Sequence, residues 1–282
     1  MSLHLHSVRC QLPDPAPPAV YPFSVPWVQS QAALEFTAPV TFLVGENGSG
    51  KSSFLEALAC AIGSIVAGGD DVGADQTLAP VRPLANRLKL SWEKRTRKGF
   101  FLRAEDFFGY VQRLARTRAR LEADLRETET EFRGRSDYAR GLATGPLRGE
   151  LRALERRYQG DLDARSHGES FVTFFRSRFV PGGLYLLDEP EAPLSPLRQI
   201  GFLALLQNLV AQDAQFIIAT HSPILMALPG AVLLNFDDNP PRPVPYADLE
   251  HVRLTRDFLN YPERFLRHLA ASAPDAGPDS GA

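Results

Sequence analysis

A glycine-rich loop carries the residues of this sequence that are best suited to chemistry. The stretch is Gly45, Glu46, Asn47, Gly48, Ser49, Gly50, Lys51, Ser52 and Ser53, and its first eight residues fit the pattern Gly-x-x-x-x-Gly-Lys-Ser/Thr. Glycine lets the backbone approach a phosphate closely, so the N–H groups of the loop can form an anion nest. Lys51 would reach the β- and γ-phosphates, and the Ser52 hydroxyl would bind Mg²⁺. The loop therefore predicts a site for a nucleoside triphosphate.

The segments on both sides of the loop have the order that this motif requires. Residues 40–44 are apolar and β-favouring, which predicts a buried strand. After the loop, apolar residues recur at helical spacing; they are Phe54, Leu55, Leu58, Ile62 and Ile65. A glycine turn that binds nothing is the alternative, but a strand before it and a helix after it favour the phosphate site.

A second set of candidate catalytic residues follows the apolar run 184–187. Asp188 and Glu189 stand at the end of this predicted strand, before Pro190. Asp188 would hold Mg²⁺ through water, and Glu189 would orient or deprotonate the attacking water. A solvated pair of carboxylates is the alternative, and it would be preferred if the phosphate loop were absent.

A histidine is the third candidate functional residue. His221 follows the apolar run 215–219, and a parallel sheet brings the ends of such strands to one edge. His221 is therefore a candidate sensor that would donate a hydrogen bond to the γ-phosphate or to the water. A structural or exposed histidine is the alternative. For an adenine-stacking ring, Tyr21, Phe23 and Trp27 are candidates, although burial against the sheet is the more common fate of aromatic residues.

A further short motif resembles a segment of a known family. Ser166, His167, Gly168 and Glu169 precede Asp188 by about twenty residues, as the nucleotide-signature segment does in the ATP-binding-cassette ATPases. With the glycine loop, the carboxylate pair and His221, the chain resembles these enzymes. It resembles more closely the stand-alone bacterial ATPases of the AAA_21/AAA_23 type, which are relatives of recombination, repair and phage-defence ATPases. The resemblance implies ATP hydrolysis by a homodimer. In it, Ser166 and Gly168 of one subunit would cap the γ-phosphate held by Lys51 of the other.

Several positions depart from the pattern of that family. Histidine stands at 167 in place of glycine, and glutamate stands at 169 in place of glutamine. Glu105 is matched to the Q-loop glutamine, which would place it near the water or Mg²⁺. Ser195 stands near the position where transporters carry an aspartate, so the sequence does not favour a transporter subunit.

The predicted fold is α/β, with a mostly parallel core sheet flanked by helices, an N-terminal antiparallel region and an inserted helical hairpin. We expect residues 1–105 and 166–271 to form the two halves of an ATPase core, residues 106–165 the insertion, and residues 272–282 a disordered tail. Residues 3–10 are expected to form an edge strand. The alternating segment 88–92 is expected to pair with the segment 100–103. A break at residues 141–146 is expected to divide the hairpin.

Composition and charge set broader limits. The 282 residues hold two cysteines, no apolar run long enough to span a bilayer and no secretory signal, so a cytosolic protein without a membrane partner is expected. Residues 82–120 contain twelve basic and three acidic side chains. Such a strip could bind nucleic-acid phosphates, or it could be a solvated, salt-bridged surface.

Three functions follow as hypotheses. The first is an ATPase that forms an ATP-sandwiched dimer in a DNA-repair- or defence-like role. The second is a nucleotide-gated binding module with little turnover, and the third is the ATPase subunit of a transporter.

Overall fold

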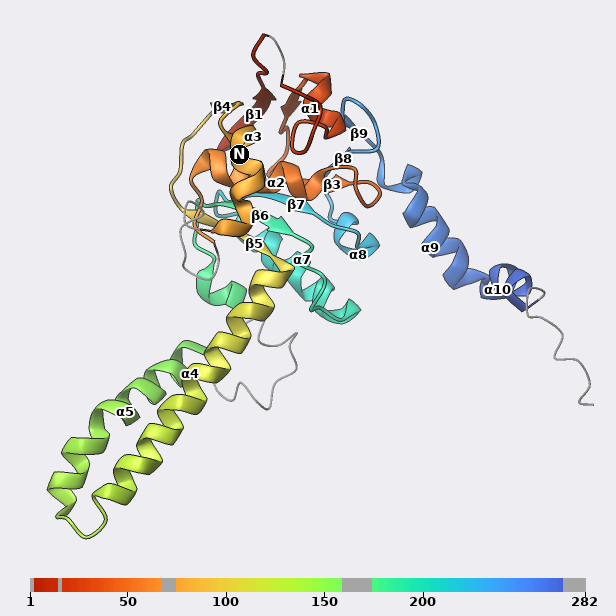
Figure 1. Cartoon of the computed structure of the whole chain (residues 1–282). Coiled ribbons are helices and arrows are strands. Elements are labelled where there is room, and N and C mark those ends of the chain that lie inside the picture. Colours follow the sequence, from red (N-terminus) through yellow and green to blue (C-terminus); the bar gives the residue numbers. More distant parts are fainter. Residues whose placement is uncertain (1–2, 15–16, 67–74, 159–173, 271–282) are drawn as a thin grey trace, which may run out of the picture. The chain divides into compact units, whose positions relative to one another are not determined.

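The computed structural model describes residues 3–14, 17–66, 75–158 and 174–270 of the chain, and its centre is a six-stranded sheet (Figure 1). The strand order is β5-β6-β7-β3-β8-β9, with β3 at Val40–Val44, β5 at Gly99–Arg103, β6 at Leu184–Asp188, β7 at Gln215–Ala219, β8 at Val232–Asn235 and β9 at Arg242–Pro243. The first five strands are parallel, and β9 is antiparallel to β8. The predicted α/β fold with a mostly parallel sheet is confirmed.

The core strands are mostly apolar because both faces of the sheet are covered. Every residue of β3, β6 and β7 is buried. Leu186 and Ile217 face the cluster that holds helix α2 (Lys51–Ile62), whereas Tyr185 and Phe216 stack on the opposite face with ring centroids 5.1 Å apart. Alternate side chains of one strand thus serve two layers, which explains why these strands lack the alternating pattern of a half-exposed strand.

A separate three-stranded antiparallel sheet has the order β2-β1-β4, with β1 at Leu5–Cys10, β2 at Ala33–Glu35 and β4 at Leu88–Trp92. Two sequence-based expectations are wrong here. Strand β1 is the central strand of this sheet, and β5 does not pair with β4 but lies parallel to β6. The cause is burial, because β4 alternates between buried and more exposed residues whereas β5 is buried from Phe100 to Arg103.

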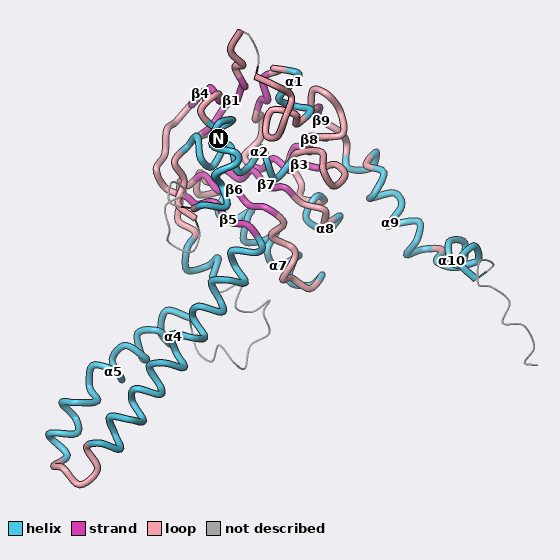
Figure 2. Tube along the Cα trace, in the orientation of Figure 1, coloured by secondary structure: helices cyan, strands magenta, loops and turns pink. Residues whose placement is uncertain are grey.

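Helices α4 (Ala104–Glu131) and α5 (Asp137–Tyr158) lie side by side as a hairpin, which Figure 2 shows in cyan. Arg148 of α5 bonds Glu129 of α4 at 2.7 Å. The chain reverses near Gly134, which has φ 92°, rather than at the expected break at residues 141–146, which α5 passes through. The left-handed glycine ends the first helix, whereas Pro146 removes one backbone hydrogen bond without ending the second.

Shorter elements complete the two compact units of the chain, residues 1–243 and 244–282. The first unit adds α1 (Pro26–Ser30), η1 (Gln76–Val81), α3 (Arg82–Ala85), α7 (Pro196–Val210) and α8 (Pro223–Met226). The second contains η2 (Tyr246–Asp248), α9 (Glu250–Asn260) and α10 (Pro262–Ala270). Among the described helices, none combines the length and the apolar character needed to cross a membrane.

Candidate functional site

The glycine loop connects β3 directly to α2, as the sequence predicts. Gly45 has φ 138° and Gly50 has φ 96°, a region of backbone conformation that residues with a side chain rarely adopt. At position 50 an added Cβ would lie 2.2 Å from Val25 Cγ1, so only glycine fits there. Helix α2 begins at the next residue, and its N-terminus adds partial positive charge to the loop. The local geometry therefore suits an anion.

Lys51 folds back over its own loop. Its side chain is buried, and Nζ donates to the Gly45 carbonyl at 2.8 Å, the Glu46 carbonyl at 2.8 Å and Ser49 Oγ at 3.2 Å. Burial lowers the pKa of Lys51, although nearby carboxylates, with Asp237 first among them, oppose this change. The ammonium group thus has three acceptors that phosphate oxygens could replace.

Asp188 lies at the end of β6, next to the start of α2. The Ser52 hydroxyl donates to Asp188 Oδ1 at 3.2 Å. Burial raises the pKa of Asp188 to about 7, and the charges of Glu189, Glu56 and Glu191 add to this effect, while the Ser52 hydrogen bond opposes it. A buried carboxylate among other carboxylates would be stabilised by a nearby cation.

The residues at this point fit Mg²⁺. A hydroxyl and a carboxylate supply the oxygen ligands that this ion prefers, and Mg²⁺ normally keeps several waters and binds phosphate oxygens. Within the described part of the chain, no group of three His, Cys, Asp or Glu side chains could hold a metal ion. The ion would therefore rely on Ser52, Asp188, water and the nucleotide.

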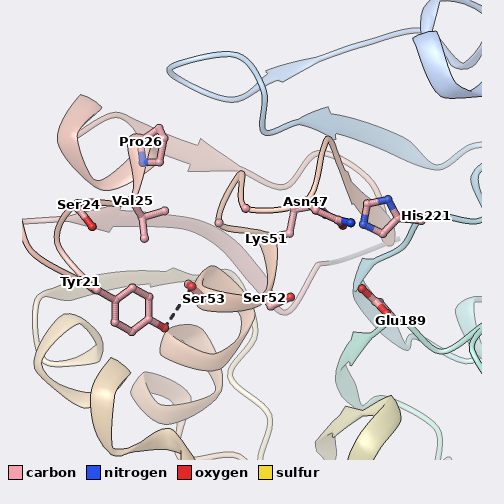
Figure 3. Close-up of a pocket in the computed structure, with 12 residues that line it drawn as sticks. Tyr21, Ser24, Val25, Pro26, Asn47, Lys51, Ser52, Ser53, Glu189 and His221 are labelled. Carbon is pink, nitrogen blue, oxygen red and sulfur yellow. Dashed lines mark hydrogen bonds between the residues drawn. The ribbon is translucent and has the colours of Figure 1, made fainter.

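Glu189 and His221 line the same cavity as Lys51 and Ser52. Figure 3 shows this cavity of about 390 Å³, with the side chains of Asn47 and His221 facing each other. Glu189 is exposed and has φ 49°, and its backbone N–H donates to the Ala219 carbonyl at 2.9 Å. A non-glycine residue with positive φ is often a feature of functional sites. The carboxylate is thus held at the rim of the cavity by its backbone.

The far end of the cavity contains an aromatic side chain. Tyr21 is 51% exposed, and its hydroxyl lies 3.3 Å from Ser53 Oγ. Trp27 is instead buried edge-on against Phe54, with ring centroids 5.0 Å apart, and Phe23 packs against the hydrophobic core. Of the three aromatic residues considered from the sequence, Tyr21 is the one that lines the cavity.

Sequence reasoning missed an aspartate that supports the loop. Asp237 follows β8, and its Oδ1 accepts a hydrogen bond from the Glu46 N–H at 2.8 Å. A Cβ at position 45 would lie 2.8 Å from the same oxygen, so this contact also requires Gly45. The only signal in the sequence was the position of an acidic pair, Asp237 and Asp238, after an apolar strand. Strand β8 lies beside β3, so the aspartate meets the loop at the same sheet edge.

Sequence reasoning also missed the cluster that surrounds Arg103, which we call the Arg103 cluster. Arg103 ends β5 and is nearly buried. It forms ion pairs with Asp106 at 2.9 Å, Asp75 at 3.0 Å, Glu105 at 3.4 Å and Glu56 at 3.5 Å. The Glu105 side chain is 72% exposed and does not line the cavity. The structure therefore places Glu105 beside Arg103 rather than beside Lys51.

The remaining predictions concern the signature residues, the C-terminal tail and the basic strip. The signature residues Ser166, His167, Gly168 and Glu169 lie outside the described residues, as does the tail from residue 272. Within the basic strip, Arg103 belongs to its cluster and Arg118 bonds Glu122 at 2.9 Å. Six basic side chains of the segment 87–98 are exposed, namely Arg87, Lys89, Lys94, Arg95, Arg97 and Lys98.

Several solved structures have a weak likeness to this chain. The Smc head domain of Pyrococcus furiosus, solved with an extended coiled coil and the C-terminal domain of ScpA, is 12% identical, with a TM-score of 0.41 over 95% of this chain and 99% of that one. The SMC head domain of Thermotoga maritima is 15% identical, with a TM-score of 0.42 over 86% and 99%. An ATP-binding subunit of an ABC transporter is 20% identical, with a TM-score of 0.36 over 73% and 78%. No curated protein matches the sequence.

Two family models match the two halves of the site. The AAA_23 family, described as an AAA domain, matches residues 24–129, which include the glycine loop. The AAA_21 family, an AAA domain whose description refers to the AbiEii toxin and type IV toxin–antitoxin systems, matches residues 170–227, which include Asp188, Glu189 and His221. Neither match spans half of the chain, but the two matches and the geometry of the loop together support a P-loop ATPase of the AAA/ABC type.

Proposed function

We propose that this protein binds ATP with Mg²⁺ beside the glycine loop and hydrolyses it to ADP and phosphate. The observation that carries this proposal is the meeting of Ser52 with Asp188 at 3.2 Å in a site where Lys51, Glu189 and His221 line one cavity. Phosphoryl transfer depends mainly on positioning and charge stabilisation, and these side chains can supply both.

Each side chain has a defined task in this mechanism. Lys51 exchanges its loop carbonyls for β- and γ-phosphate oxygens, while Ser52 and Asp188 would hold the metal. Bound Mg²⁺ would neutralise phosphate charge. Glu189 orients the attacking water or accepts its proton, and His221 donates a hydrogen bond to the γ-phosphate or to the water. Tyr21 is placed to contact the base.

A dimer around the nucleotide would complete the site. The sequence pattern supports this arrangement, because Ser166, His167, Gly168 and Glu169 match a segment that caps the γ-phosphate bound by a second subunit. Two large apolar side chains follow the carboxylate turn; Leu197 is 78% exposed and Ile200 is 56% exposed. Exposed apolar side chains of this kind at the start of α7 would suit a contact with a second copy. A defence role agrees with the description of the AAA_21 family, which refers to a type IV toxin–antitoxin system.

Glu189→Gln tests the proposal most directly. We expect ATP turnover to fall by about 10²–10³-fold, as is typical when one transition-state contact is lost, while ATP binding persists. The dimer should then accumulate with ATP and Mg²⁺, which light scattering coupled to size exclusion would detect. Lys51→Ala is the control, because it should lose nucleotide binding and dimer together. Normal phosphate release by the Glu189→Gln variant would overturn the role of Glu189.

A second candidate function is nucleotide-gated binding of nucleic acid with little turnover. The observation that favours it is the exposed basic segment 87–98, in which the single acidic residue, Glu93, already accepts a hydrogen bond from the Leu3 N–H at 3.1 Å. Binding through phosphates should weaken steeply as salt rises. Measurement of DNA binding at several salt concentrations, with and without ATP, tests this candidate; no binding at low salt would eliminate it.

A further inference from the structure

We infer that Glu191 is a positioning residue that fixes the loop of His221 to the turn of Glu189. The inference rests on the proposed function, since it concerns the relative placement of two side chains that would act on the γ-phosphate and the water. Glu191 itself does not line the cavity. Its effect on ATP hydrolysis would therefore be exerted through the residues that it holds.

The carboxylate of Glu191 lies close to two successive residues of the loop after β7. Its Oε1 accepts a hydrogen bond from the His221 backbone N–H at 2.7 Å. The Thr220 side chain lies close enough to this carboxylate to oppose the rise of its pKa, and Thr220 is fully buried. Because Glu191 stands two residues after Glu189, one short turn carries both the proposed catalytic carboxylate and the support for His221.

The turn itself is held by backbone hydrogen bonds. The Ala192 N–H donates to the Glu189 carbonyl at 3.1 Å, and the Leu194 N–H donates to the Glu191 carbonyl at 2.7 Å. The Glu189 N–H donates to Ala219 at the end of β7. The turn and the histidine loop are therefore joined twice, once through the backbone of Glu189 and once through the side chain of Glu191.

The network continues from the histidine loop to α7. The Ser222 N–H donates to Thr220 Oγ1 at 3.0 Å, and the Ser222 hydroxyl donates to Gln199 Oε1. Gln199 Nε2 in turn donates to the Leu194 carbonyl at 3.0 Å, which returns to the turn of Glu189. These bonds form a closed ring, so a displacement of the histidine loop would disturb several polar contacts at once.

A carboxyl group at this position carries a cost in stability. Glu191 Oε2 is buried and has no hydrogen-bond partner among the described residues. Burial is also the main reason that the pKa of Glu191 is raised. A buried polar atom without a partner destabilises a fold, and such costs are concentrated where function requires a fixed geometry. The retained hydrogen bond from the His221 N–H provides that geometry.

A merely structural role for Glu191 makes a different prediction from a positioning role. Loss of a structural contact would lower stability and leave the turnover of the folded protein unchanged. Loss of a positioning contact should lower kcat while ATP affinity stays nearly constant, because the phosphate-binding loop is untouched. The two roles are therefore separable by steady-state kinetics together with nucleotide binding.

The experiment compares Glu191→Ala, Glu191→Gln and Thr220→Val with the wild type. We expect Glu191→Ala to lower kcat by about tenfold or more, the equivalent of one lost hydrogen bond at the transition state, with the Kd for ATP changed by less than about threefold. Glu191→Gln should recover most of the turnover, because its carbonyl oxygen can accept the hydrogen bond from the His221 N–H. Thr220→Val should give a smaller loss and serves if Glu191→Ala does not fold.

Two further measurements complete the test. Hydrogen exchange of the His221 amide should be faster in Glu191→Ala than in the wild type, in the absence of nucleotide. Glu93→Ala is the matched control, because it also removes a carboxylate that accepts a backbone N–H, at 3.1 Å from Leu3 and away from the cavity, and its kcat should be unchanged.

The outcomes separate this inference from the proposed function. Wild-type turnover in Glu191→Ala and Thr220→Val, or equal losses in Glu191→Ala and Glu191→Gln, would overturn the positioning role while ATP hydrolysis stands. A wild-type protein without ATP turnover would overturn the proposed function, and the catalytic part of this inference with it; faster exchange at His221 would then show that Glu191 only braces the loop.

Discussion

Two groups of carboxylates lie at the ends of neighbouring strands, and they differ in how their charge is balanced. Arg103 of β5 is paired in register with Asp188 of β6. In the Arg103 cluster, one guanidinium is surrounded by four carboxylates. Around Asp188 the neighbouring charges include Glu189 and Glu191, and the nearby ammonium of Lys51 donates to its own loop instead.

The pKa values show the consequence of this difference. Although burial raises the pKa of Asp75, the hydrogen bonds from Thr77 and the charge of Arg103 outweigh it, so the net shift is downward. Burial raises the pKa of Glu56 in the same cluster, and the charge of Arg103 opposes that shift. The pKa of Asp188 is raised to about 7 by burial, and the like charges of nearby glutamates add to this effect. The Arg103 cluster thus contains its own cation, whereas the Asp188 site would gain one if a metal ion bound. Uncompensated charge of this kind is typical of functional sites.

The largest expected effect comes from breaking the balanced cluster. Arg103→Met would leave buried carboxylates without their cation, and we expect the free energy of unfolding to fall by about 3–5 kcal/mol. Urea denaturation measures this change. Arg140→Met is the matched control, because Arg140 pairs with Asp137 at 2.7 Å where the two side chains are 48% and 93% exposed, and its loss should cost under about 1 kcal/mol. Equal losses of unfolding free energy in the two variants would show that the buried Arg103 cluster matters no more to stability than an exposed ion pair.

An intermediate effect is expected from neutralising the unbalanced site. The pKa of Asp188 is about 7 in the folded protein, against an ordinary value of 3.8, so between these pH values the folded state retains a proton that the unfolded state has released. Stability must then fall as pH rises between these two values. In nucleotide-free protein with a chelator at pH 8, Asp188→Asn should raise the free energy of unfolding by about 1–3 kcal/mol while hydrolysis is lost.

The pH dependence supplies the control for this variant. The stability difference between Asp188→Asn and wild type should be small at pH 5 and should widen toward pH 8, as urea denaturation at each pH would show. A variant that is less stable than the wild type at pH 8, or a stability difference that does not depend on pH, would show that the ionised Asp188 carboxylate does not destabilise the folded state.

The smallest effect is expected at Glu105. Because its side chain is 72% exposed, Glu105→Gln should change the free energy of unfolding by less than about 0.5 kcal/mol. Its position beside Arg103 also predicts ATP turnover within about threefold of the wild type, since a contact made outside the cavity adds little in the transition state. A loss of tenfold or more would instead support the place near water or Mg²⁺ that the resemblance assigns to Glu105.

Local patterns in the sequence predicted the parts of the fold that depend on local order. The strand, glycine loop and helix around Lys51 are contiguous, so their residue types alone specify them. The carboxylate pair and His221 followed from apolar runs that end at one sheet edge. In the structure Glu189 and His221 line one cavity with Lys51 and Ser52, and Asp188 contacts Ser52 beside it.

Most of the missed features depend on contacts between distant segments. Asp237 meets Glu46 across 191 positions, and Arg103 collects Asp75 and Glu56 from two other elements. The partner of β5 was misassigned because the sequence of a single strand does not specify which strand it pairs with. The hairpin break was misplaced because several glycines fit a turn, and only Gly134 of that segment takes a left-handed φ.

The three hydrogen bonds of Lys51 to its own loop have a consequence for the resting protein. The ammonium group ties the Gly45 and Glu46 carbonyls to the Ser49 hydroxyl, so the Lys51 side chain braces the turn of the loop from within. A nucleotide bound as proposed would exchange these three bonds for bonds to phosphate oxygens. A ligand with few phosphates would offer Lys51 fewer acceptors than it gives up, so the loop should favour a triphosphate over a monophosphate.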